Sequence, residues 1–267
     1  AKTVDLVSSG GVNGGIMGKI IAVANQKGGV GKTTTAVNLA ACVAAKQRRV
    51  LLCDFDPQGN ATSGFGATDQ GKYTIYDVMV GAAEIGSAVL RTKWCDVIPA
   101  SIDLAAAEVE LATVEGRERR LKEALGRIKE DYDYIFIDCP PSLGVLTLNS
   151  LVACDTVLVP MQCEYYALEG LSQLVNSIRT VKRSLNPKID IESIVLTMYD
   201  GRTNLTIQVA EEIKKFFGEK VYSTVVPRNV RLSEAPSHGM PIIAYEKTSR
   251  GAEAYSAIAD EFLRRNR

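Results

Sequence analysis

The sequence lacks most of the features that mark a secreted, metal-rich or membrane-spanning protein. Its six cysteines form no Cys-x-x-Cys pair, and most lie inside apolar runs. This favours buried thiols in a reducing compartment over disulfides or a metal cluster. No stretch reaches the ~18 apolar residues that a spanning helix needs, and no basic segment followed by an apolar core indicates an export signal. These absences predict a cytoplasmic protein.

Net charge is lacking as well. Lysine plus arginine and aspartate plus glutamate both number 31, so the formal net charge is zero. Any binding to nucleic acid must therefore depend on a local basic patch rather than on bulk attraction. No internal repeat, low-complexity tract or linker follows residue 17. The 267 residues, 46% of them hydrophobic, suit one large core or two small ones, and the even spread of apolar segments favours a single domain.

The first 16 residues differ from the rest of the chain. They are polar and rich in glycine, and we expect a flexible leader or an expression remnant before a natural start at Met17. The folded domain is therefore predicted to span residues 17–267.

From Lys19 onward, short β-branched runs alternate with helical stretches. The predicted strands are Ile20–Ala24, Val50–Cys53, Asp96–Ile98, Tyr134–Ile137, Thr156–Pro160, Ile191–Thr197 and Val221–Val226. The predicted helices are Thr33–Lys46, Glu118–Lys129, Leu168–Leu185, Leu205–Phe217 and Gly251–Arg264. This alternation predicts a single-domain α/β fold with a mostly parallel, twisted sheet and helices on both faces. The strands are continuously apolar, as burial on both faces requires.

One segment carries the strongest functional pattern. Residues 24–34, ANQKGGVGKTT, follow an apolar strand and open a helix, which is the context of a phosphate-binding P-loop. Glycines allow consecutive N–H groups to turn toward an anion, and the helix adds its positive end. Lys32 is expected to reach the β- and γ-phosphates, and Thr33 to bind Mg²⁺. A glycine-rich turn that only links strand to helix is the weaker alternative. The predicted nucleotide-binding residues of the loop are Gly28, Gly29, Val30, Gly31, Lys32, Thr33 and Thr34.

The loop departs from the strict Walker pattern at its first position. Gln26 stands six residues before Lys32, where glycine is usual, and an additional lysine, Lys27, follows it. The string KGGVGKT resembles the deviant Walker A motif of the ParA, MinD and nitrogenase-iron-protein class of P-loop NTPases. The resemblance implies an ATP-dependent homodimer in which Lys27 crosses the interface to the partner's nucleotide. A second cation beside a triphosphate also suits the stabilisation of transition-state charge.

Acidic residues follow two of the predicted strands. Asp54 and Asp56 come after the strand at Val50, and Asp138 follows Tyr134–Ile137. In a parallel sheet these carboxyl ends are where ligands bind, and carboxylates there hold Mg²⁺ or orient the attacking water. A single aspartate at a strand end can instead cap a turn. Three acids beside a P-loop favour a catalytic site. The resemblance assigns water positioning to Asp56 and the Walker B role to Asp138, and it leaves Asp54 less defined.

Further strings extend the resemblance to the rest of the chain. The segments DPQGNAT (56–62), DCPPSLG (138–144), QCEYYALEG (162–170) and PRNVRLSEAPSHG (227–239) are similar to those of the chromosomal ParA proteins called Soj. The similarity covers roughly residues 17–265. It implies a slow, Mg²⁺-dependent ATPase that forms an ATP-bound sandwich dimer and binds double-stranded DNA without sequence preference. It also implies a ParB-type partner whose basic N-terminal tail stimulates hydrolysis, and a location at the nucleoid.

Basic residues in the late loops are candidates for the DNA surface. Spacing alone supports only solvated loop residues, but the resemblance implies DNA contacts at Arg202 and Arg231. Met198 and Pro227, at predicted strand ends, either flank the adenine or pack in the core. The full set of candidate DNA-binding residues is Arg202, Arg228, Arg231, Lys247 and Arg250.

Other members of the class fit less well. Larger plasmid-type ParA proteins carry an N-terminal helix-turn-helix domain, whereas only the short leader precedes the P-loop here. Nitrogenase-type relatives bridge an iron–sulfur cluster, and Cys139 has no convincing second ligand. MinD-type relatives end in an amphipathic membrane helix, but the mixed charge of residues 255–265 favours docking on the core. A DNA-positioning ATPase is therefore the first hypothesis. A MinD-like regulator at a membrane is the alternative, and a metabolic P-loop enzyme is a third.

Overall fold

The computed structural model describes residues 18–68, 70–142 and 144–267, so Met17 and the predicted leader lie outside the described residues. The strands are β1 (Lys19–Val23), β2 (Val50–Asp54), β3 (Leu90–Arg91), β4 (Asp96–Ile98), β5 (Tyr134–Asp138), β6 (Thr156–Gln162) and β7 (Asp190–Thr197). The longer α-helices are α1 (Lys32–Ala44), α6 (Val145–Ala153), α7 (Ala167–Ser184), α8 (Asn204–Phe217) and α11 (Arg250–Arg265). Shorter ones are α2 (Asn60–Gly64), α3 (Ile75–Val80), α4 (Leu104–Glu110), α5 (Arg120–Gly126), α9 (Val230–Glu234) and α10 (Ile242–Tyr245).

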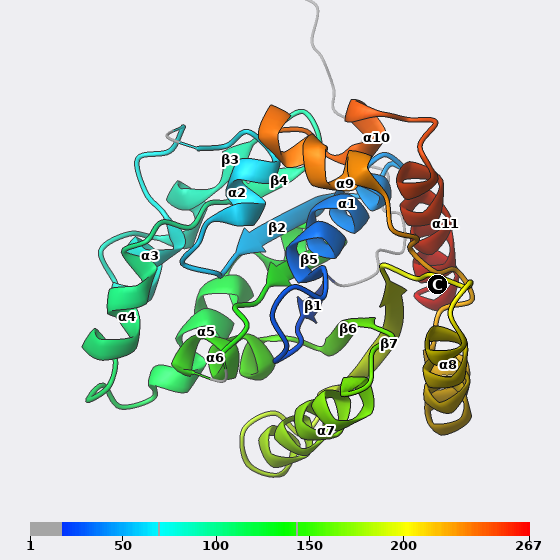
Figure 1. Ribbon diagram of the computed structural model, residues 1–267. Coiled ribbons are helices and arrows are strands. Elements are labelled where there is room, and N and C mark those ends of the chain that lie inside the picture. Colours follow the sequence, from blue (N-terminus) through cyan, green and yellow to red (C-terminus); the bar gives the residue numbers. More distant parts are fainter. Residues whose placement is uncertain (1–17, 69, 143) are drawn as a thin grey trace, which may run out of the picture.

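The strands form one seven-stranded sheet in the order β3-β4-β2-β5-β1-β6-β7. Every pairing is parallel except that of β3 with β4. The first strand of the chain, β1, therefore lies near the middle of the sheet, with β5 on one side and β6 on the other (Figure 1). This places the loop after β1 beside the carboxyl ends of both neighbours, where open α/β sheets bind their ligands.

Helices cover both faces of the sheet, and the side chains of β1 alternate between them. Ile20 and Ala22 belong to a core cluster shared with residues of α3 to α8. Ile21 and Val23 belong to a second cluster shared with α1, α10 and α11. Figure 1 shows α1 and α11 on one side of the sheet and α5, α6 and α7 on the other. The predicted α/β fold, with a mostly parallel sheet and helices on both faces, is confirmed.

Six of the seven predicted strands are present within two residues of their expected ends. The prediction of a strand at Val221–Val226 is wrong. The segment follows β7 through hydrogen bonds from Tyr222 N to Ile194 O (3.0 Å) and from Val226 N to Leu196 O (2.8 Å), and it forms only isolated bridges. Between these bonds, the Ser223 N–H donates to the Glu261 carboxylate instead of to β7, at 3.2 Å from each oxygen. This interrupts the ladder.

The predicted helices are present, with one much shorter than expected. The α-helical part of the predicted Glu118–Lys129 helix is α5, Arg120–Gly126, with short 3₁₀ turns at Arg117–Arg119 and Lys129–Asp131. The helix α6 was not predicted. Its sequence, VLTLNSLVA, includes the polar residues Thr147, Asn149 and Ser150, but these are buried together with most of the apolar ones. It therefore lacks the one-sided pattern of a surface helix.

The last helix packs on the protein as predicted. The α11 side chains Tyr255, Ile258 and Phe262 are buried, and they belong to the core cluster shared with α1. The Phe262 ring also lies 4.9 Å from that of Tyr134, edge to face. Among the described residues, no helix is both long and apolar enough to span a bilayer. All six cysteines are buried and free of disulfides, as the sequence predicted.

Candidate nucleotide site

The loop between β1 and α1 has the backbone of a phosphate cradle. Gly29 and Gly31 have φ angles of +73° and +84°, which residues with a Cβ atom adopt only with strain. Gly28 has no such φ, so the sequence argument from backbone freedom is wrong for this residue. A Cβ at Gly28 would meet no atom of the chain within 4 Å. Glycine at this position leaves the space beside the loop free of any side chain.

Two side chains, Asn25 of the loop itself and Thr197 of β7, hold the cradle in place. The Asn25 amide donates to Pro160 O at 2.8 Å and accepts from Lys27 N at 3.0 Å, which ties the start of the loop to β6. The Thr197 hydroxyl, at the end of β7, donates to Val30 O at 2.7 Å. The loop is thus fixed by contacts on the chain itself before any ligand binds.

Lys32 points into this loop. It is 7% exposed, and its ammonium donates to Lys27 O at 3.0 Å. Burial lowers the pKa of Lys32, while the nearby Asp138, Cys139 and Asp56 act in the opposite direction. A buried cation at a helix start with one backbone acceptor has capacity left for an anion. The prediction that Lys32 binds phosphate fits this geometry.

The other lysine of the loop makes a different contact. The Lys27 ammonium forms an ion pair with the Glu164 carboxylate, which follows β6. Both side chains are about half exposed, at 38% and 44%. The Lys27 backbone therefore contacts Lys32, while its side chain is directed to Glu164 and is partly exposed. Its predicted contact with a partner's nucleotide stays a prediction.

Asp138 is the most poorly satisfied acid of the described chain. It ends β5, it is fully buried, and neither carboxylate oxygen has a hydrogen-bond partner among the described residues. Burial and then the charge of Asp54 raise its pKa well above the ordinary value, and Thr33 and Lys32 are close enough to offset part of this rise. A buried carboxylate without a donor is costly in a stable fold, and it suits a group that binds a cation or its water.

The other two acids differ in what their carboxylates contact. Asp54, also fully buried, accepts from Thr62 N and from the Thr62 hydroxyl, both at 2.7 Å. Burial raises its pKa to about 6. Asp56 is 8% exposed, accepts from Gln58 N at 3.0 Å, and lines the cavity beside the loop. Asp56, not Asp54, therefore faces the space where a nucleotide would lie.

These residues fit a Mg·nucleotide better than they fit a metal held by the protein alone. Within residues 18–68, 70–142 and 144–267, no group of three or more His, Cys, Asp or Glu side chains could hold a metal ion. P-loop proteins bind Mg²⁺ largely through phosphates, waters and one hydroxyl. Here the glycine cradle, the unpaired carboxylate of Asp138 and the nearby Thr33 hydroxyl supply that arrangement. Cys139 is a poor ligand for a cluster, because burial raises its pKa to about 12.

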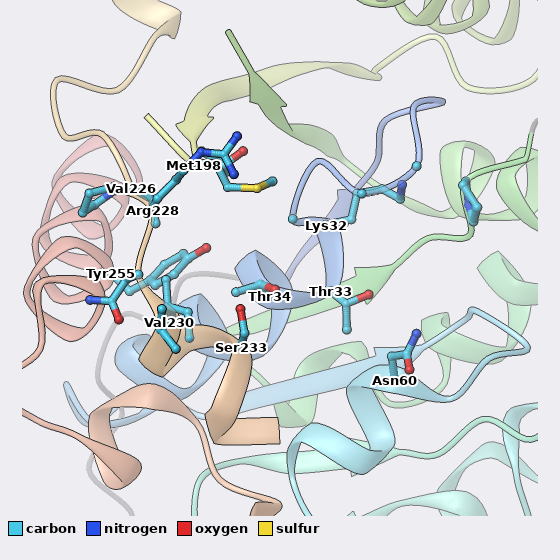
Figure 2. Close-up of a pocket in the computed structure, with 18 of the residues that line it drawn as sticks. Lys32, Thr33, Thr34, Asn60, Met198, Val226, Arg228, Val230, Ser233 and Tyr255 are labelled. Carbon is cyan, nitrogen blue, oxygen red and sulfur yellow. The ribbon is translucent and has the colours of Figure 1, made fainter. Parts of the chain in front are cut away.

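A cavity of about 710 Å³ lies against the loop, a size typical of small-molecule sites. Figure 2 shows Lys32, Thr33 and Thr34 on one side of it and Met198, Arg228 and Tyr255 on the other. Met198 has φ = +48°, a strained backbone angle for a residue with a side chain. Met198 and Pro227 both line the cavity, which favours a nucleotide contact over core packing. Lining residues that were not predicted are Gln58, Asn60, Pro141, Thr197, Val226, Asn229, Val230, Leu232, Ser233 and Tyr255.

The five basic residues proposed for DNA are all exposed, but they do not share one environment. Arg202 makes a two-pronged ion pair with Asp200, with N–O distances of 2.7 and 2.8 Å. Arg231 pairs with Glu234 at 2.8 Å. Arg228 lines the nucleotide cavity. Lys247 borders a separate cavity between α1 and α11, and Arg250 begins α11.

Comparisons with known proteins show the family of the chain. Residues 18–191 match the family model described as AAA domain. The chain is 60% identical to the sporulation initiation inhibitor protein Soj of Bacillus subtilis, over 92% of this chain and 98% of the relative. It is 53% identical to the chromosome partitioning protein ParA of Myxococcus xanthus, over 94% of this chain and 89% of the relative.

A solved structure with the same fold was determined with a nucleotide analogue. The chain resembles a cobyrinic acid a,c-diamide synthase from Mycobacterium smegmatis, solved with a bound ATP analogue and magnesium. The TM-score is 0.80 and the identity 39%, over 92% of this chain and 95% of the other. With a P-loop, acids at two neighbouring strand ends and relatives matched over nearly their whole length, this chain belongs to the Soj/ParA family of chromosome-partitioning ATPases.

Proposed function

We propose that the chain is an ATP-hydrolysing dimerisation switch that binds DNA non-specifically in its ATP form and drives chromosome or plasmid partitioning. The observation that carries this proposal is a partly exposed lysine next to a glycine with free space around it, both in the phosphate loop. The Lys27 side chain is half exposed, and a Cβ at Gly28, which also lines the nucleotide cavity, would meet no atom of the chain within 4 Å. An ordinary P-loop has no use for either feature. A second copy of the chain, approaching its nucleotide from the side of these two residues, has a use for both.

The nucleotide would be held by the glycine cradle, Lys32 and the cavity behind it. Mg²⁺ would be bound by Thr33 and the ATP phosphates, with Asp138 and Asp56 near its waters, and would neutralise phosphate charge during transfer. Lys32 balances negative charge on the phosphates. Asp56 lines the cavity and orients the attacking water. We expect Asp56→Ala to keep Mg·ATP affinity and lose turnover, measured as phosphate release. Turnover at the wild-type rate would contradict the role of Asp56.

Dimerisation is tested at Gly28. Because nothing of the chain lies near its Cβ position and its φ is ordinary, Gly28→Val is compatible with the monomer fold. The added side chain would stand between two facing loops. We expect the variant to bind ATP but to stay monomeric with a non-hydrolysable ATP analogue, measured by analytical ultracentrifugation.

Gly86→Val is the matched control. It adds the same side chain at a glycine that also has an ordinary φ and no neighbours within 4 Å, but lies away from the loop. The control should dimerise like the wild type. Gly28→Val that dimerises fully with the analogue would remove the proposed interface.

DNA binding is proposed for the surface that carries Arg202 and Arg231. The chain has no net charge, so one copy offers only a small basic patch, whereas a dimer doubles it and gains from effective concentration. Each arginine is paired with a nearby carboxylate, Asp200 or Glu234, in the free chain. Both side chains are more than half exposed, at 89% and 54%, so the pairs are solvent-screened and weak. Phosphates can therefore replace the carboxylates.

Salt titrations test this surface. A dimer loses two phosphate contacts per substitution, so Arg202→Ala and Arg231→Ala should each flatten the log–log salt slope by about one to two units. The measurement is binding of a labelled random duplex with ATP at several salt concentrations. Arg127→Ala, which removes another exposed arginine paired with a carboxylate, is the control and should leave the slope unchanged. Equal slopes in all variants would place the DNA surface elsewhere.

A ParB-type protein with a basic N-terminal tail is proposed as the partner that accelerates hydrolysis, and the nucleoid in the cytoplasm as the location. Two alternatives remain as outcomes of the same assays. A MinD-like regulator would bind anionic vesicles with ATP, but here the apolar side chains of α11 are buried against the core. A metabolic enzyme would bind neither DNA nor vesicles and would consume ATP only with a small-molecule substrate.

A further inference from the structure

Asp54 is the one acid of the site whose carboxylate is already saturated by the chain. It ends β2, and one oxygen, Oδ1, accepts from Asp56 N at 3.2 Å. The other, Oδ2, accepts from both Thr62 N and the Thr62 hydroxyl at 2.7 Å. Two of the three donors come from the far end of the 54–62 segment. One buried carboxylate therefore holds together both ends of the segment that carries Asp56.

These contacts argue against a role for Asp54 as a magnesium ligand. Asp54 is fully buried and is not among the residues that line the nucleotide cavity. Its neighbour in the sheet register, Asp138, is equally buried but has no donor on either oxygen. A cation would be attracted to the carboxylate without donors first, because three hydrogen bonds already occupy Asp54.

The segment that Asp54 closes is well defined. Gly59 has φ = +63°, which allows the sharp turn before α2, and Gly59 N donates to Asp56 O at 2.9 Å. The Thr62 hydroxyl also accepts from Ala100 N at 3.0 Å, beyond the end of β4. The Asp54 carboxylate thus connects the 54–62 segment to a second strand through a single buried hydroxyl.

We propose that Asp54 is a positioning residue, which holds the Asp56 carboxylate at its distance from the phosphate loop by fixing both ends of the 54–62 segment. This inference rests on the proposed ATP hydrolysis and on the role of Asp56. Asp54 itself is fully buried and does not line the nucleotide cavity. Its removal should therefore alter turnover much more than nucleotide affinity.

The test compares turnover with affinity in the full-length chain. Asp54→Asn keeps the shape but turns an amide N–H₂ toward backbone or hydroxyl donors. Because a misplacement of about 1 Å can cost on the order of 10²-fold in rate, we expect turnover to fall about 10²-fold. The dissociation constant for Mg·ATP should change by less than about threefold, because the phosphate loop is untouched.

Substitutions of Thr62 make the test independent of whether Asp54→Asn folds. Thr62→Val removes the hydroxyl but keeps the N–H, and should lower turnover about tenfold. Thr62→Ser restores the hydroxyl and should restore turnover to within about twofold of the wild type. The double variant Asp54→Asn/Thr62→Val should be slower than Asp54→Asn by much less than about tenfold, because both changes break the Asp54–Thr62 contact and only the contact of Thr62 with Ala100 N is lost in addition.

Asp77→Asn is the matched control for a purely structural effect. Asp77 also accepts from the N–H and the hydroxyl of one threonine, Thr74, at 2.7 and 3.2 Å, but in α3 away from the cavity. The control should lower the thermal midpoint and leave turnover unchanged.

Two results would overturn the inference: wild-type turnover in Asp54→Asn or Thr62→Val, and a loss of ATP affinity equal to the loss of turnover. A wild-type chain without turnover would overturn the proposed function together with it.

Discussion

Two buried carboxylates at opposite ends of the sheet differ in how many hydrogen-bond donors they have. At the amino ends of β1, β6 and β7, the Glu192 carboxylate accepts from Lys19, from Thr156 at 2.7 Å and from Asn266 at 2.7 Å. At the carboxyl end of β5, Asp138 is fully buried with no donor on either oxygen. The first end uses a buried charge to hold strands and the last helix together. The second keeps a buried charge available for a ligand.

The pKa of the buried acid is lowered at the first end, in Glu192, and raised at the second end, in Asp54 and Asp138. Burial would raise the pKa of Glu192, but the hydrogen bonds from Lys19, Thr156 and Asn266 bring it below its ordinary value of 4.5. Glu192 therefore stabilises the fold above pH 4.5, and this contribution is lost as the pH falls through its lowered pKa. Burial raises the pKa of Asp54 from 3.8 to about 6, so the protonated carboxyl is the form that favours folding. This stabilisation is lost as the pH rises from 3.8 to about 6. The buried acids of the functional end thus weaken the fold at neutral pH.

The largest expected effect is at Lys32, which has one acceptor on the chain and would gain the phosphates. Lys32→Ala should weaken Mg·ATP binding by at least about 10²-fold, or ~3 kcal/mol. Titration calorimetry measures it. Lys46→Ala, just past the end of α1, removes a lysine that only pairs with Asp260, at 2.7 Å. Affinity in this control should stay within about twofold of the wild type. Equal losses in both variants would mean that the lysine of the loop has no special role.

The next effect lies at the amino end of the sheet. Glu192→Gln removes the charge that Lys19 and Thr156 contact, and should lower the free energy of unfolding at pH 7 by about 1.5–3 kcal/mol. The loss should shrink as the pH falls below 4.5, and it should vanish once the pH has passed the lowered pKa at which the wild-type Glu192 becomes protonated in the folded chain. Urea unfolding at several pH values measures it. A loss that is independent of pH would show that the network acts through packing rather than through charge.

The smallest effect is a gain in stability rather than a loss, and it distinguishes the two ends of β5. Asp138→Asn replaces a buried acid without donors by a neutral amide, and should stabilise the nucleotide-free chain by about 1 kcal/mol. It should also weaken the Mg²⁺ dependence of ATP binding. Asp133→Asn, just before the same strand, removes a carboxylate that accepts from Arg49 N at 2.8 Å and from its guanidinium at 3.0 Å.

Thermal unfolding without nucleotide measures both variants of this pair. Asp133→Asn should be less stable than the wild type, and Asp138→Asn more stable. A stability loss in both would contradict the contrast between the two ends of β5.

The sequence was sufficient for the sheet because its strands are buried on both faces and therefore continuously apolar. The helix α6 was not predicted because its three polar residues are buried with the apolar ones, so no exposed polar face marks it. Val221–Val226 has the composition of a strand, but a hydrogen bond from Ser223 to Glu261 on α11 interrupts its pairing. That bond joins residues far apart in the chain, and no local pattern indicates it.

The candidate site also contains residues that the sequence predicted and residues that it did not. The loop and the acids are predictable because phosphate binding needs glycine, lysine and strand-end carboxylates at fixed positions. Thr197 and Tyr255 were not predicted, since each reaches the cavity from an element late in the chain. The ion pair of Lys27 with Glu164, 137 residues away, was equally outside local reasoning.

The central claim is that ATP assembles the chain into the form that binds DNA. Gel filtration with light scattering on Asp56→Ala, which should hold ATP without hydrolysing it, tests this most directly. We predict a monomer without nucleotide, a dimer with Mg·ATP, and co-elution with a random DNA duplex only when ATP is present. A monomer in the presence of ATP, or equal DNA binding with and without it, would contradict the account.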